Sequence, residues 1–150
     1  MSDLIMYYTR SNNTKTVAEI IANKVGGDLL EIIDNKKRNG PIRYLTSLID
    51  VSRDNPTTVT YPKVDLNQYD TIYVGTPVWM SKPAPAINKF IEENDFTGLD
   101  VVTFATMASS GGESTTSIMN EEISKKGGNV IKSFAVTAKE DMKTQTLNYI

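Results

Sequence analysis

The stretch "YYTRSNNTKT", residues 7–16, decides how this chain folds. After its two tyrosines, four hydroxyl side chains and two asparagines fall within eight residues. The run that leads into it, "DLIMYY" (3–8), predicts a short buried strand. Beyond it, apolar side chains recur at the spacing of one helix face, at Val17, Ile20, Ile21 and Val25. The stretch is therefore a strand-to-helix corner that is unusually rich in small polar side chains.

The same alternation continues along the chain. Further apolar segments predict strands at 28–33, 70–75, 100–106 and 129–136. Helical patterns lie at 14–25, at 42–51 with Ile42, Leu45, Leu48 and Ile49 on one side, after Pro83 and Pro85, at 113–126 and at 140–150. Residues 56–68 are expected to form an irregular connection. Strands alternating with helices predict an α/β fold: one domain, 1–150, with a doubly wound five-stranded parallel sheet in the order 2-1-3-4-5.

The composition restricts the chemistry. The 150 residues carry a net charge of −2, which leaves no basic footprint for nucleic acid. There is no apolar run of transmembrane length and no signal-peptide pattern, so we expect a cytoplasmic protein. The absence of cysteine and histidine excludes thiolate catalysis and a Ser-His-Asp triad, and no metal site is expected. Any chemistry is therefore expected to belong to a bound cofactor.

The corner itself predicts a phosphate site. In a sheet of this order, ligands bind outside the carboxyl ends of the strands, where the strand order reverses. The first loop at that edge combines free helix N–H groups with side-chain donors, which favours an anion. Its residues are Thr9, Arg10, Ser11, Asn12, Asn13 and Thr14. Asn12 suits a left-handed backbone. Helix capping would explain one or two of these residues and not the whole run.

Two further loops are expected at the same edge. The second consists of Thr76, Pro77, Val78, Trp79, Met80 and Ser81. Its tryptophan follows a predicted strand, where it can stack on a flat ligand, or else cover the sheet edge. The third contains Thr106, Met107, Ala108, Ser109, Gly111 and Gly112. Its small residues let a backbone approach a ligand closely, although an ordinary loop is the alternative. Together the three loops predict a flat, phosphorylated ligand, and FMN fits.

These segments resemble the flavodoxin family over nearly the whole chain. The family's phosphate motif is T/S-x-T/S-G-x-T, and residues 9–14 match it with Asn12 in place of the glycine. The segments "YDTIYVGTPVW" (69–79) and "VVTFATMASSGG" (101–112) resemble the third and fourth strands with their ring-binding loops. The last strand lacks an inserted hairpin, as in short-chain members. The resemblance implies bound FMN, with its phosphate at 9–14 and Trp79 packed on the inner part of its ring.

Three departures from the family pattern change the expectations. The third loop has no aromatic side chain for the outer face of the ring, which leaves that face open, with Met107 as partial cover. Met80 stands where many members have a glycine whose peptide flips when the flavin is reduced, so a flip is expected to be costlier. The net charge of −2 is far from the strong acidity that is typical of the family's carriers.

The resemblance implies an electron-transfer flavoprotein with no catalytic acid, base or nucleophile. We expect a monomer that contacts redox partner proteins transiently, and no nucleic acid or membrane partner. The main alternative is an FMN-dependent oxidoreductase that acts on quinones or other acceptors with NAD(P)H. A signalling receiver is rejected because the strands end in Tyr8-Thr9 and Gly75-Thr76 rather than in acids. A cysteine-dependent phosphatase is excluded, and a flavin-free interaction module stays open.

Overall fold

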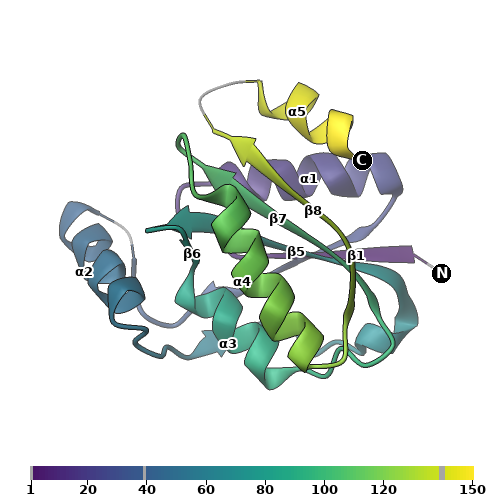
Figure 1. Cartoon of the computed structure of the whole chain (residues 1–150), viewed down its shortest axis with the longest axis horizontal. Coiled ribbons are helices and arrows are strands. Elements are labelled where there is room, and N and C mark those ends of the chain that lie inside the picture. Colours follow the sequence, from purple (N-terminus) through teal and green to yellow (C-terminus); the bar gives the residue numbers. More distant parts are fainter. Residues whose placement is uncertain (1, 39, 139–140) are drawn as a thin grey trace.

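Five parallel strands form the centre of the molecule (Figure 1). The computed structural model describes residues 2–38, 40–138 and 141–150. The strands lie in the order β2-β1-β5-β7-β8, which confirms the expected order 2-1-3-4-5 when they are counted along the chain. Their bounds are β1 Ser2–Tyr7, β2 Asp28–Glu31, β5 Tyr69–Trp79, β7 Asp100–Met107 and β8 Asn129–Thr137.

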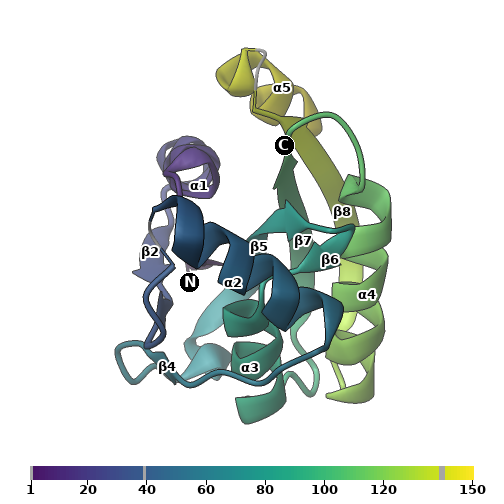
Figure 2. The same ribbon diagram turned by 90° about the vertical axis from the view of Figure 1, so that its left-hand side faces the viewer.

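Helices cover both faces of this sheet, as a doubly wound fold requires. Figures 1 and 2 show α1 and α5 on one face and α3 and α4 on the other. Their bounds are α1 Asn13–Val25, α3 Pro85–Glu93, α4 Gly112–Lys125 and α5 Met142–Tyr149. In the part of the chain that the structure describes, no helix has the length and apolar character needed to cross a membrane.

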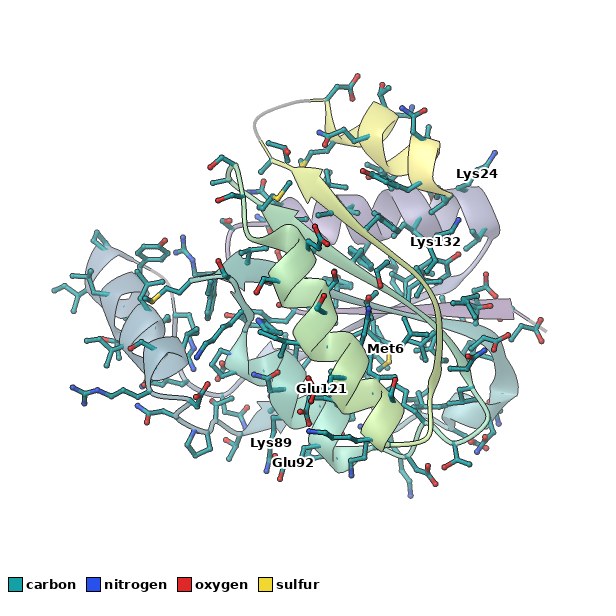
Figure 3. All side chains as sticks on the ribbon, viewed as in Figure 1. Met6, Lys24, Lys89, Glu92, Glu121 and Lys132 are labelled. Carbon is teal, nitrogen blue, oxygen red and sulfur yellow. The ribbon has the colours of Figure 1, made fainter. Side chains whose placement is uncertain are left out.

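The position of β1 between two helix layers explains why its sequence is apolar from Leu4 onward. Leu4 and Met6 belong to the core on the α3–α4 side, whereas Ile5 and Tyr7 belong to the core on the α1–α5 side. A strand that is covered on both faces has no polar face. Met6 is fully buried, whereas Lys24 on α1 points away from the molecule (Figure 3).

Residues 28–33 do not form one strand, which corrects the expectation from the sequence. After β2 the chain forms β3 (Ile33–Asp34), which pairs antiparallel with β4 (Val59–Thr60) in a separate sheet. The expected irregular connection therefore contains a strand, and it also contains a 3₁₀ helix, η1 (Leu66–Gln68). Strands this short carry too few residues for an alternation to be recognised.

The helix α2 (Pro41–Ser52) lies beyond the carboxyl end of β5, to one side of the helices that cover the sheet (Figure 1). Ile42, Leu45 and Ile49 share one side, as expected, but that side faces solvent, whereas Leu48, which was expected on the same side, packs against the core. The exposed fractions of Ile42, Leu45 and Ile49 are 79%, 61% and 48%. The inner side carries the buried residues Ser47, Asp50 and Val51. A contiguous apolar surface of this kind is typical of a contact site.

Candidate functional site

The first loop turns into α1 and leaves most of its polar groups unused. Asn12 has a φ of 70°, which confirms the predicted left-handed backbone at this position. Its side chain makes no capping hydrogen bond, and the first turn of α1 contains no acidic residue. The Lys15 N–H donates to Thr9 Oγ1 over a long 3.4 Å. The N–H groups at this helix end are therefore available to an anion.

A buried pair of hydroxyl groups ties this loop to the neighbouring strand. Thr14 Oγ1 and Thr106 Oγ1 lie 2.8 Å apart, and both side chains are buried. Thr14 belongs to the first turn of α1, and Thr106 lies near the end of β7. The hydrogen bond therefore fixes the N-terminus of α1 against the edge of the sheet.

A cavity of about 310 Å³ opens at this edge. It brings together most of the first loop and parts of the other two predicted loops. It is lined by Thr9, Arg10, Ser11, Asn13, Thr14, Pro77, Val78, Thr106, Met107, Ala108 and Ala138. Ala138 is the lining residue that sequence reasoning missed. The sequence could have indicated Ala138, because this residue comes just after the last predicted strand, and the carboxyl end of that strand lies at the same edge of the sheet.

The second loop is a β-hairpin, which corrects the expectation that the strand ends at residue 75. The strand β5 runs on to Trp79, and β6 (Lys82–Pro83) pairs antiparallel with its end. Met80 and Ser81 connect the two strands, and their φ values are 52° and 60°. Two successive positive φ values define a type I′ turn, which favours asparagine and glycine. Met80 therefore already has a left-handed backbone. The expectation that a peptide flip at this position is costly when a flavin is reduced stays a prediction.

This turn leads to a prediction on stability. We expect the double substitution Met80→Asn with Ser81→Gly to raise the free energy of unfolding by about 1–2 kcal/mol, because it removes left-handed strain from two residues. Met80 is 57% exposed, so little packing is lost. Urea denaturation of the two proteins measures the difference. An unchanged or lowered free energy of unfolding would contradict the observed turn geometry.

Trp79 is buried and is the last residue of β5, whereas the sequence predicted that it follows the strand. Its ring meets Tyr8 edge-on, with 5.7 Å between ring centroids, and the Arg38 guanidinium lies 5.8 Å from its centroid. Burial raises the pKa of Tyr8 well above its usual value. Trp79 is not among the residues that line the cavity, and its contact with a flavin ring stays a prediction.

Seven other predicted residues also lie away from the cavity lining, namely Asn12, Thr76, Met80, Ser81, Ser109, Gly111 and Gly112. Thr76 is buried, and its hydroxyl accepts a hydrogen bond from the Ala84 N–H at 3.0 Å and donates one to the Pro77 carbonyl at 2.9 Å. Thr76 therefore holds the hairpin against the start of α3. Ser109 is exposed at the tip of the third loop.

The paired glycines of the third loop serve close packing within the protein. Gly111 has a φ of 92°, and a Cβ added there would lie 2.9 Å from Val78 Cγ1. A Cβ added at Gly112 would lie 2.3 Å from Ala135 Cβ. The third loop thus approaches the hairpin and β8 more closely than a larger residue allows. The predicted roles of both glycines toward a cofactor stay predictions.

Sequence reasoning also missed a basic segment beside the first loop. Arg38 donates to Asp34 from Nε at 3.0 Å and to Asp50 from Nη1 at 2.7 Å, and Lys36 also donates to Asp50. Burial would by itself raise the pKa of Asp50, but hydrogen bonds from Lys36, Asn55 and Arg38 outweigh it and lower that pKa to about 2. The run "KKR" (36–38) could have indicated this basic segment from the sequence.

Comparisons with known proteins agree with this geometry. The model of a family described as flavodoxin matches residues 2–145. No curated protein sequence matches the chain.

Several solved structures are similar over nearly their whole length. A flavoprotein from Lactobacillus acidophilus NCFM, crystallised in complex with FMN, is 26% identical, with 99% of this chain and 97% of that chain covered and a TM-score of 0.80. The apo form of the flavoprotein from Lactobacillus acidophilus NCFM, solved by NMR, is 25% identical, with 96% and 95% covered and a TM-score of 0.72. Oxidised flavodoxin 1 from Bacillus cereus shares the fold at 19% identity, with 99% and 94% covered and a TM-score of 0.60.

Proposed function

Because this chain belongs to the flavodoxin family, we propose that it binds FMN in the cavity of about 310 Å³ and carries electrons between redox partner proteins. The observation that carries the proposal is the first loop, in which the Asn12 side chain makes no capping hydrogen bond to α1 and whose position is fixed by the Thr14–Thr106 hydrogen bond. The similar flavoprotein crystallised with FMN supports the identity of the cofactor.

The residues at this edge fit FMN. The N–H groups of α1, together with Thr9, Ser11 and Asn13, would hold the phosphate through hydrogen bonds, without a metal. Val78 and Met107 line the same cavity and offer apolar surface to a flat ring. When bound, FMN supplies the redox chemistry. The protein contributes binding and orientation, and we assign no catalytic acid, base or nucleophile.

The outward face of α2 is the surface that we assign to partner contact. Ile42, Leu45 and Ile49 are exposed there. The helix adjoins the proposed FMN site, because the Arg10 guanidinium lies 4.5 Å from the centre of the Tyr44 ring on α2. A partner bound to this face would therefore lie next to the phosphate loop. Transient binding, a monomeric state and a cytoplasmic location belong to the same proposal.

An FMN-dependent oxidoreductase that uses NAD(P)H is the second candidate function. One observation favours it: the basic side chains of Lys36, Lys37, Arg38 and Arg43 border the first loop and offer charge for the phosphates of a second nucleotide. A purified protein that oxidises NAD(P)H without a partner would support this candidate.

The first experiment is a visible spectrum of the purified protein after addition of FMN, followed by anaerobic titration with dithionite. We expect protein-bound flavin bands and reduction in two resolved one-electron steps, which supports a carrier. Tight FMN binding with reduction in one two-electron step would favour the oxidoreductase. A protein that binds no FMN would contradict both candidates.

A further inference from the structure

A second hollow, of about 440 Å³, lies directly beside the proposed FMN site. Thr9 and Arg10 line both, so the first loop is a wall shared by the two. The hollow is lined by Tyr8, Thr9, Arg10, Glu31, Ile32, Ile33, Asp34, Lys36, Lys37, Arg38 and Arg43. Its size is within the range of about 300–1,000 Å³ that is usual for small-molecule sites.

The positive charges around this hollow exceed what the protein itself neutralises. Arg38 and Lys36 are paired with Asp34 and Asp50. In the described ranges, by contrast, Lys37 and Arg43 form no ion pair, and both are exposed at the rim.

The remaining groups at the rim do not cancel this excess. Arg10 stacks on the Tyr44 ring rather than on a carboxylate. The other acid in the lining, Glu31, accepts a hydrogen bond from the Tyr7 hydroxyl at 3.3 Å. Three cations therefore face the hollow from the first loop, from residue 37 and from α2, with a single acid outside the ion-pair network to oppose them.

The buried arginine of the lining has an unused donor. The Arg38 side chain is only 3% exposed, and its Nη2 is buried without a hydrogen-bond partner. A buried donor without a partner is costly, and a guanidinium is well suited to phosphate oxygens. Nη2 itself is enclosed, and the guanidinium lies over the Trp79 ring, so Arg38 adds positive charge behind the hollow, whereas direct contacts to a ligand fall to the exposed cations of the rim.

We propose that this hollow binds the diphosphate of a nucleotide next to FMN. The inference rests on the proposed function, because it places a second phosphorylated ligand against the wall that the two sites share. Lys37 and Arg43 would hold the diphosphate at the rim. The exposed side chain of Ile33 offers the lining an apolar surface for the base. An electron-donating dinucleotide carries such a diphosphate.

The test is calorimetric titration of the FMN-saturated protein with ADP at low ionic strength, so that the FMN site is occupied and cannot take the probe. We expect Lys37→Gln and Arg43→Gln each to raise the Kd for ADP about tenfold, since each removes a charge-assisted contact. The matched controls Lys63→Gln and Arg53→Gln, which replace exposed cations away from the hollow, should leave the Kd unchanged. Adenosine, which lacks the diphosphate, should bind at least about 100-fold more weakly than ADP if both phosphates are contacted.

Three results would overturn the proposal: no binding of ADP, equal binding by the Lys37 and Arg43 variants, or equal weakening by the two control variants. The flavin spectrum is recorded for every protein. A loss of the flavin bands would report failure of the FMN site, whereas a loss of ADP heat with the bands intact would report failure of the hollow alone.

Discussion

Replacing Ser11 by aspartate is expected to weaken FMN binding by about 100-fold or more. Ser11 is exposed in the first loop and lines the cavity, so the new carboxylate would stand where we place the phosphate. At an effective dielectric constant of about 20, two like charges about 5 Å apart repel each other by roughly 3 kcal/mol, which is a factor of about 100 in affinity.

The same substitution should not destabilise the protein without cofactor. A carboxylate at the N-terminus of α1 interacts favourably with the helix dipole, by about 0.5 kcal/mol. The first turn of α1 contains no acid in the natural sequence, although an acid there would stabilise the helix. A substitution that weakens FMN binding but does not lower the stability of the protein without cofactor would therefore identify the loop as an anion site rather than a helix cap.

Fluorescence titrations with FMN and with riboflavin measure this effect. Riboflavin lacks the phosphate, so its affinity should stay within about twofold in the Ser11→Asp protein, because the repulsion is then absent. Ser117→Asp, at an exposed position on α4, is the matched control and should change neither affinity. Equal weakening of FMN and riboflavin would place the phosphate elsewhere.

Replacing Gly75 by alanine is expected to lower the free energy of unfolding by about 2–3 kcal/mol, since overpacking a rigid core costs this much. Gly75 lies in the central strand β5, and a Cβ added there would lie 2.1 Å from Cζ and 2.3 Å from Cε2 of Phe104. Phe104 is fully buried and stacked on Phe134, with 5.8 Å between ring centroids. The ring therefore has little room to move away.

Urea denaturation tests this clash, and two variants separate it from other effects. Gly98→Ala introduces backbone strain at a φ of 75° with no atom within 4 Å of the new Cβ, and should cost only about 1 kcal/mol. In the double variant Gly75→Ala with Phe104→Leu, the smaller side chain should recover part of the loss. A Gly75→Ala protein that is more stable than Gly98→Ala would disprove the clash.

The sequence determined the α/β class, the strand order and the position of the first loop. These follow from local patterns, namely apolar runs alternating with helical periods and a polar corner at residues 9–14. The left-handed Asn12 was predictable because the preference for that backbone is a property of the residue itself. The three loops were expected to lie at the same edge of the sheet because parallel strands direct their carboxyl ends to the same side.

Only the tertiary structure decided how the site is held together and what surrounds it. The burial of Trp79 depends on Tyr8 and Arg38, which come from distant parts of the sequence. The inner side of α2 is set by the pairing of Asp50 with Lys36 and Arg38 and by the burial of Val51 in the core, and Ile42, Leu45 and Ile49 therefore face outward. Local periodicity shows that a helix has an apolar side, but the direction of that side is set by contacts between distant segments.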